Sequence, residues 1–290
     1  MNSNNKGLIK ISGCDNPSRR GNIVFVHGLA GHPWNTWHWQ KPQDKNYQKD
    51  KFWPVWLGET FPDIGIWTFG YSAARFTTNG SAMPLFDQAS NLLENLQNYE
   101  LGEHPIVFVT HSMGGLLVKK MLSTAQNFPA NNQDILDSTK GIVFISTPHV
   151  GSDVAQWVNS LAGFLTTVNV EELKPHAPQL RELDEWYRQN VDTLGIKTKV
   201  YYETLPTNGV LIVNASSANP GIKDVKPVAV EEANHDSIAK PESNNSMIYL
   251  GVERFIKECV PKQKVLPPGD ATIPIEIQNK DQIKNPQMPL

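Results

Sequence analysis

Ser112 stands at an abrupt change in the chain, where the apolar run Ile106-Val-Phe-Val-Thr-His ends in Ser-Met-Gly-Gly115. The run predicts a buried strand, and Gly114 is typical of a helix that passes close to the strand before it. A serine held at such a sharp turn presents its Oγ as a nucleophile. Thr110 departs from the usual Gly-x-Ser-x-Gly pattern, so the motif alone also fits an ordinary strand-to-helix turn.

A serine nucleophile needs a histidine base and a carboxylate that orients this base. Where the serine lies in a strand-turn-helix elbow, the acid and then the histidine follow it along the chain. His235 follows the last predicted strand in a polar loop and is the best candidate for the base. Glu203 follows the penultimate predicted strand and is the first choice for the acid. Asp224, Glu231 and Glu232 lie in the next loop, and Asp224 is the alternative acid.

The other histidines near the motifs fit the role of base less well. His149 directly follows a strand but precedes every candidate acid, so a structural or turn-stabilising role suits it better. His176 lies in a helical insertion, where we expect it to face solvent. His111 is expected to point away from the nucleophile, and His27 to hydrogen-bond loop backbone. Neither of these two is expected to titrate in the mechanism.

Ester cleavage through a serine also needs backbone N–H groups that stabilise the oxyanion of the tetrahedral intermediate. The N–H of Met113, the residue after the nucleophile, is the first expected donor. The second comes from the loop His27-Gly-Leu-Ala-Gly31, in which Leu29 is the expected donor. This loop is only moderately specific by itself, but together with Ser112 and His235 in this order it becomes a strong signal.

The elements that must position these residues alternate between strands and helices. Apolar runs predict strands at 8–11, 23–26, 64–69, 106–111, 141–146, 199–202 and 210–213. Apolar residues at helical spacing predict helices at 83–97, 115–125, 153–168, 171–190 and 247–258. This order predicts an α/β fold with a mainly parallel sheet covered by helices on both faces. The reactive residues follow strands, so we expect them at the carboxyl edge of the sheet.

Length and composition fit one domain. The 290 residues, 39% of them hydrophobic, suffice for one substantial core. We expect an N-terminal edge segment at 1–20, a catalytic domain at 21–259 with an insertion at about 152–195, and a linker-like or disordered tail at 260–290. The net charge of −3 and the lack of a long basic block argue against nucleic acid as a partner.

Cysteine usage and hydropathy indicate the compartment. Cys14 and Cys259 lie in unrelated contexts at opposite ends of the chain, so we expect no disulfide framework, no thiolate metal site and a reducing environment. The first residues lack the apolar core of a secretory signal, and no run of about 18 apolar residues predicts a membrane span. The expected location is the cytoplasm, with peripheral membrane contact left open.

Several motifs in order resemble the serine-active-site-containing (SERAC-like) lipase-type hydrolases, and more distantly the inositol deacylases that act on GPI anchors. They are the segments 26–31, 110–115, 146–152, 203–207, 216–221 and 234–241. The resemblance spans roughly residues 20 to 258. It implies an α/β-hydrolase fold with Ser112, Glu203 and His235 as the triad, favours Glu203 over Asp224 and tolerates Thr110. Related domains also occur at the N-terminus of multidomain proteins with nucleotide-binding oligomerisation modules, which suits the linker-like tail.

These observations predict a cofactor-free serine esterase or lipase that acts on a lipid or phospholipid ester, with acyl transfer to another alcohol as a variant. The apolar stripe that includes Trp157, Leu161 and Phe164 either packs on the core or lines an acyl-chain pocket or a lipid surface. The tryptophans from Trp34 to Trp56 pose the same alternative. An alternative interpretation is a lipase-like effector or binding module of a larger signalling or defence protein. Such a module would be gated by a C-terminal sensor domain outside this chain and weakly active or inactive alone.

Overall fold

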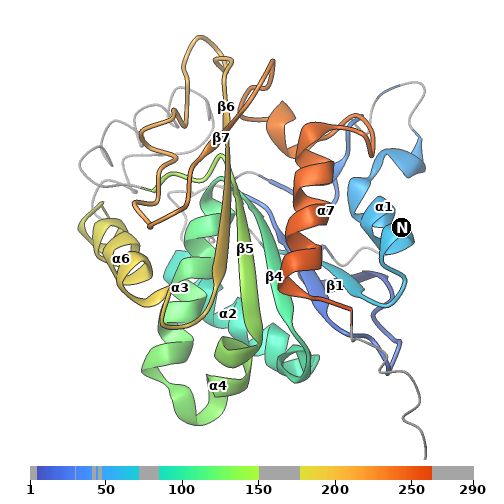
Figure 1. The fold of residues 1–290 in the computed structure, drawn as a ribbon, viewed down its shortest axis with the longest axis vertical. Helices are drawn as coiled ribbons and strands as arrows, with labels where there is room; N and C mark the ends of the chain where they lie inside the picture. The colour runs from blue at the N-terminus through green and yellow to red at the C-terminus, as the bar shows by residue number, and fades with distance from the viewer. Residues whose placement is uncertain are drawn as a thin grey trace, which may run out of the picture.

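The structure, a computed structural model, describes residues 5–29, 31–40, 44, 48–71, 85–149 and 177–262. Its strands are β1 (Gly7–Ser12), β2 (Asn22–Val26), β3 (Gly65–Gly70), β4 (Ile106–His111), β5 (Thr139–Ile145), β6 (Lys197–Glu203) and β7 (Val228–Val230). Within the described ranges they form one seven-stranded sheet with the order β1-β3-β2-β4-β5-β6-β7 (Figure 1). β1 runs antiparallel to β3, and the other neighbouring strands pair in parallel. The prediction of an α/β fold with a mainly parallel sheet is confirmed.

Helices cover both faces of this sheet (Figure 1). One face carries α1 (Trp53–Thr60) and α7 (Met247–Cys259). The other carries α2 (Leu85–Asn98), α3 (Met113–Asn127), α4 (Pro129–Ser138) and α6 (Ala177–Asn190). Short 3₁₀ helices are η1 (Asn35–Trp37), η2 (Lys49–Lys51), η3 (Leu101–Glu103) and η5 (Ser237–Ala239). No helix in the described ranges is long and apolar enough to cross a membrane.

The central strands β2 and β4 are buried along their whole length because they face a core on each side. In β2, Ile23 and Phe25 pack into the core formed with α1 and α7. Val24 and Val26 point the opposite way, into the core formed with α2 and α3. β4 repeats this alternation, so the two strands that precede the His27 loop and Ser112 are held rigidly at the centre of the sheet.

The last strand of the sheet is not the predicted one. Residues 210–213 were expected as a strand, but only Val210 pairs there, in an isolated bridge with Thr207. β7 instead takes the last position and pairs with 201–203 of β6. β7 has only three residues, and Lys223, Lys226 and Pro227 precede it. This apolar run is too short to predict a strand from the sequence.

The tryptophan-rich connection contributes mainly to packing. Trp37 and Trp53 are fully buried in the core beside α1, whereas Trp39 is 39% exposed. Helices α1 and α4 were not predicted, because α1 is short and α4 is mostly polar. The predicted helix at 153–168 and most of the tail at 260–290 lie outside the described residues.

Candidate functional site

Ser112 lies at the turn between β4 and α3 in a strained backbone conformation. Its φ of 51° and ψ of −127° are rarely adopted by a residue with a side chain. Gly114 allows this turn, since a Cβ there would lie 2.3 Å from the carbonyl oxygen of Val26. Thr110 is accommodated because its hydroxyl donates a hydrogen bond to the carbonyl of Val143 at 2.9 Å. The departure from the common motif is therefore absorbed by a contact with the neighbouring strand.

The structure brings Ser112, His235 and Glu203 together, and we call these three residues the Ser112 cluster. Ser112 Oγ lies 3.0 Å from His235 Nε2, and His235 Nδ1 lies 3.3 Å from Glu203 Oε2. The three residues are 3%, 2% and 0% exposed. A carboxylate oxygen only accepts, so Nδ1 carries the proton of a neutral His235 and Nε2 is left to accept the proton of Ser112.

Glu203, at the carboxyl end of β6, is held by two further donors. The N–H of Val213 donates to Oε1 at 2.7 Å. The hydroxyl of Ser146 donates to Oε2, the oxygen that also faces His235. Ser146 directly follows β5 and has a φ of 44°, a left-handed conformation that its buried contacts hold in place. Neither contact was predicted, and no local pattern in the sequence signals them.

The backbone of His235 is fixed on both sides. Its N–H donates to Thr207 Oγ1 at 3.0 Å. Its carbonyl accepts a hydrogen bond from Nε2 of His111 at 2.8 Å. Burial and the neighbouring His235 lower the pKa of His111 to about 3, so its ring is neutral near pH 7. His111 thus supports the backbone of the candidate base, a contact that the sequence did not reveal.

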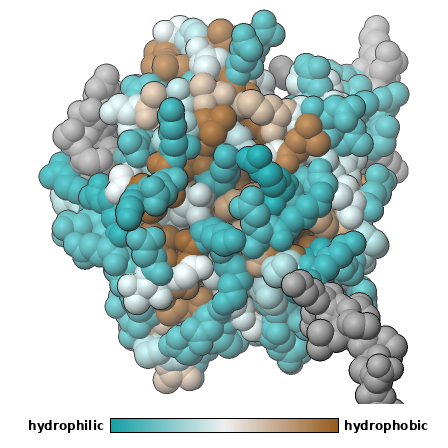
Figure 2. All heavy atoms as spheres, in the orientation of Figure 1, coloured by the Kyte–Doolittle hydropathy of each residue, from teal (hydrophilic) through white to brown (hydrophobic). Residues whose placement is uncertain are grey.

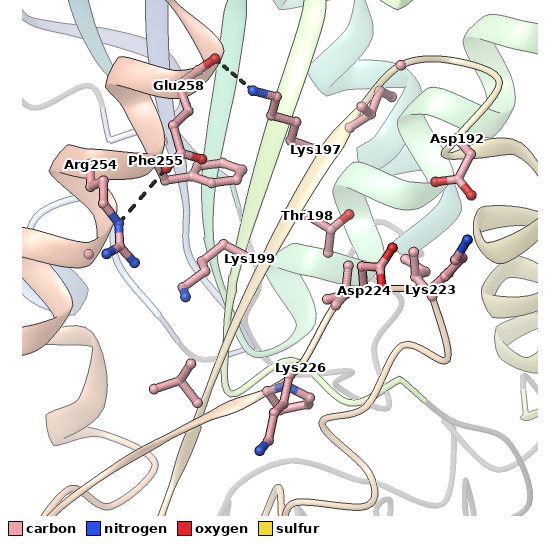
Figure 3. Close-up of a pocket in the computed structure, with 17 residues that line it drawn as sticks. Asp192, Lys197, Thr198, Lys199, Lys223, Asp224, Lys226, Arg254, Phe255 and Glu258 are labelled. Atoms are coloured by element: carbon pink, nitrogen blue, oxygen red, sulfur yellow. Dashed lines mark hydrogen bonds and ion pairs between the residues drawn. The ribbon is translucent and has the colours of Figure 1, made fainter.

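The alternative acid Asp224 is not brought to His235. It is exposed and lines a groove of about 900 Å³ along the amino-terminal half of β6, the end of the strand opposite to Glu203 (Figure 3). None of the three residues of the Ser112 cluster lines this groove. Glu231 and Glu232 are likewise exposed. Glu203, in contrast, contacts His235 directly.

The residues expected to donate to the oxyanion belong to two segments that adjoin Ser112. Met113 is the first residue of α3, and the N–H groups of a first helical turn have no partner within the helix. The loop that carries Leu29 touches Ser112, because a Cβ on Gly28 would lie 2.7 Å from the Cβ of Ser112. Both segments therefore adjoin Ser112, and the role of the two N–H groups as oxyanion donors stays a prediction.

His149 belongs to a second buried group, the Lys119 cluster, formed with Lys119 of α3 and Asp184 of α6. Lys119 Nζ lies 2.8 Å from His149 Nδ1 and 2.5 Å from Asp184 Oδ1. Burial, followed by the charge of Lys119, lowers the pKa of His149 to about 4. The cluster joins α3, α6 and the loop after β5, in keeping with a structural role for His149.

The remaining expectations concern the apolar stripe, metal binding and the cysteines. Trp157, Leu161, Phe164 and His176 lie outside them, so the expected acyl-chain wall stays a prediction. Within the described ranges, no three histidine, cysteine or acidic side chains are grouped as a metal site would require. Cys14 and Cys259 are both buried and free.

Comparisons with known proteins agree with the sequence motifs. The model of a family described as "Putative serine esterase (DUF676)" matches residues 20–176. Protein SERAC1 of Homo sapiens is 31% identical over 262 residues, which cover 84% of this chain and 39% of that protein. Protein SERAC1 of Danio rerio is 32% identical over 269 residues, with 85% and 40% covered. The chain thus spans about two fifths of the length of these curated relatives.

Solved structures show the same fold at low sequence identity. The lipase BlEst2 of Bacillus licheniformis superposes with a TM-score of 0.55 at 16% identity, over 87% of this chain and 99% of that one. A carboxylesterase from the thaumarchaeon Nitrososphaera gargenis superposes with a TM-score of 0.52 at 12% identity, over 87% and 94%. These neighbours confirm the α/β-hydrolase fold.

Proposed function

This chain belongs to the serine esterase family whose model it matches, and on that premise we propose that it hydrolyses carboxylic esters through Ser112, His235 and Glu203. The observation that carries this proposal is the continuous path of contacts from Ser112 Oγ through both ring nitrogens of His235 to Glu203 Oε2. This arrangement can deprotonate a serine, orient the histidine and stabilise the imidazolium that forms.

The reaction begins when Ser112 Oγ attacks the ester carbonyl carbon and its proton passes to His235 Nε2. Glu203 stabilises the resulting imidazolium, while the N–H groups of Met113 and Leu29 bind the oxyanion. His235 then gives the proton to the departing alkoxide, which leaves as the alcohol. Water, deprotonated by the same nitrogen, attacks the acyl-enzyme. His235 then returns this proton to Ser112 Oγ, which leaves as the free hydroxyl while the carboxylic acid is released.

We further propose that the ester carries an apolar acyl group, as in a lipid or phospholipid. Leu205 and Leu211 support this, because they are 44% and 37% exposed on the segments that follow Glu203. Figure 2 shows hydrophobic residues on the upper part of the molecule, where these loops lie in Figure 1. Exposed apolar side chains on the segments that follow the proposed acid suit contact with an acyl chain or a lipid surface.

Hydrolysis of p-nitrophenyl esters of increasing chain length tests both statements. We expect turnover by the wild type, its loss in Ser112→Ala, and unchanged turnover in the matched control Ser216→Ala, which alters an exposed serine. Replacing Leu205 and Leu211 together by Ser should slow long-chain esters more than acetate. Turnover that survives Ser112→Ala would overturn the mechanism, and equal losses on all chain lengths would overturn the lipid assignment.

A well-folded wild type without turnover would favour the alternative, an effector or binding module that needs a further domain. The observation behind this alternative is that the chain covers only about two fifths of its curated relatives. Assaying a longer product of the same gene, if one exists, would then separate a gated enzyme from an inert module.

A further inference from the structure

Tyr71, the first residue after β3, lies beside the loop that carries Leu29. Its buried ring stacks on the imidazole of His27, with 4.4 Å between the ring centroids and 9° between the ring planes. Its hydroxyl donates a hydrogen bond to the backbone carbonyl of His27 at 2.7 Å. The mechanism above assigns no step to Tyr71, so this contact needs another explanation.

Gly28, between His27 and Leu29, shows why the loop needs support from outside. A Cβ at this position would lie 2.7 Å from the Cβ of Ser112 and 3.0 Å from the carbonyl oxygen of His111. Glycine therefore lets the loop lie directly against the nucleophile. Glycine also has more backbone freedom than any other residue, so it does not itself fix the peptide groups on its two sides.

Each of the two peptide groups that flank Gly28 is held by an aromatic side chain. The hydroxyl of Tyr71 holds the carbonyl of the first, between His27 and Gly28. The ring of His27 holds the second, because Nδ1 lies 2.9 Å from the carbonyl oxygen of Gly28. The N–H of Gly31 donates to this same oxygen at 3.1 Å. In a planar trans peptide the carbonyl and the next N–H point in opposite directions, so the orientation of the Gly28 carbonyl sets that of the Leu29 N–H.

The protonation states fit this arrangement. Burial lowers the pKa of His27 to about 4, so the ring is neutral near pH 7 and Nδ1 carries the proton donated to Gly28. His27 Nε2 is buried without a hydrogen-bond partner among the described residues, as expected for the nitrogen that bears no proton. Burial also raises the pKa of Tyr71, which keeps its hydroxyl a donor.

We propose that Tyr71 is a positioning residue of the oxyanion hole, which holds His27 and through it the Leu29 N–H in the orientation that receives the oxyanion. This inference rests on the proposed function of Ser112. Because the negative charge that the N–H meets develops only as the tetrahedral intermediate forms, and not in the bound ester, the contribution of Tyr71 belongs to kcat and not to KM.

The variant Tyr71→Phe tests this, since it removes one hydroxyl and keeps the stacked ring. Tyr187→Phe is the matched control, because Tyr187 is also buried and its hydroxyl hydrogen-bonds Thr198 Oγ1 at 2.8 Å, away from the loop. We expect kcat for a short-chain ester to fall roughly 10-fold in Tyr71→Phe with KM nearly unchanged, less than the 10²–10³-fold typical of deleting an oxyanion donor. Binding of a trifluoromethyl ketone, which mimics the tetrahedral intermediate, should weaken in parallel. The control should change neither value.

Equal kcat values in the two variants, or a change in KM alone, would overturn the proposal. A second measurement needs no turnover: amide hydrogen exchange in peptides covering 26–31 should be faster in Tyr71→Phe than in the wild type and in Tyr187→Phe. Unchanged exchange would also overturn it. A wild type that lacks turnover would contradict the proposed function instead, and the exchange result would still decide the role of Tyr71.

Discussion

Two buried clusters meet helix α3, and each of them pairs a histidine with a carboxylate. The Ser112 cluster lies at the start of the helix and adds a hydroxyl to His235 and Glu203. The Lys119 cluster lies farther along the helix and adds an ammonium to His149 and Asp184. The residue types are nearly the same, but the third partner differs.

That third partner decides what each histidine can do. In the Ser112 cluster, Nδ1 of His235 faces the carboxylate and Nε2 faces a hydroxyl that can release a proton. In the Lys119 cluster, Nδ1 of His149 faces an ammonium, and burial together with this charge lowers the pKa of the ring to about 4. Such a histidine is a poor base near neutral pH, so a buried histidine–carboxylate pair is not by itself a sign of catalysis.

The largest difference between the clusters should appear when each carboxylate is neutralised. Glu203→Gln should lower kcat by roughly 10³–10⁴-fold, because the imidazolium of His235 loses its stabilising charge. Asp224→Asn, at the alternative acid, should leave kcat nearly unchanged. Steady-state ester hydrolysis measures both variants, and swapped effects would assign the acid to Asp224.

The Lys119 cluster should respond in stability rather than in rate. Lys119→Met removes the ammonium closest to the buried carboxylate of Asp184. The guanidinium of Arg188 remains, 3.6 Å from Asp184 Oδ2. We expect the free energy of unfolding to fall by about 3–5 kcal/mol. Urea unfolding measures this loss. The kcat of the folded fraction should stay within a few-fold of wild type. A large loss of kcat in fully folded protein would show that this cluster shares in the reaction.

A smaller effect should come from Ser146, which lies outside the Ser112 cluster and supports its carboxylate. Ser146→Ala removes one hydrogen bond to Glu203 Oε2. A hydrogen bond to a charged group contributes about 1.5–3 kcal/mol. We expect kcat to fall roughly 10-fold, the lower end of this range, because Glu203 keeps its hydrogen bond from Val213. Thr204→Ala is the control, because its hydroxyl bonds the Val230 carbonyl beside the same strand end. Equal kcat values for the two variants would leave Ser146 without a role in orienting the acid.

The smallest expected effect concerns pH. The pKa of His149 is about 4 in the folded protein and 6.5 for the free side chain, so between these values the unfolded chain binds more protons and stability rises with pH. Acidification from pH 6.5 to 4.5 should therefore lower Tm. His27 and His111 contribute to this fall as well, because their pKa values are also lowered in the folded protein. His149→Gln should make this fall shallower. An identical pH dependence in the variant would contradict a neutral, buried His149.

The sequence could single out the candidate serine and histidine because their signals are local. Ser112 directly follows an apolar run and precedes two glycines by one residue. His235 lies in a polar loop after the last predicted strand. The acid was harder to choose, since Glu203 and Asp224 both lie between these residues in the chain. Only the fold shows that Glu203 ends β6 beside His235 while Asp224 faces a groove at the other end of the strand.

Contacts between distant side chains could not be predicted. Tyr71 meets His27 across 44 residues, and Ser146 meets Glu203 across 57. Lys119, next to Lys120 on α3, gave no sign that it would be buried and paired with Asp184, 65 residues later. β7 was missed for a related reason, because a three-residue strand is defined by its pairing with β6 rather than by its own pattern.

The most direct test of the central claim is to map the adduct of a fluorophosphonate probe by peptide mass spectrometry. We predict a single adduct on Ser112 in the wild type and in Asp224→Asn. We predict none in Ser112→Ala and strongly slowed labelling in His235→Ala, because a serine hydroxyl reacts only when a base activates it. An adduct on another serine, labelling of His235→Ala at the wild-type rate, or no labelling of well-folded wild type would contradict the account.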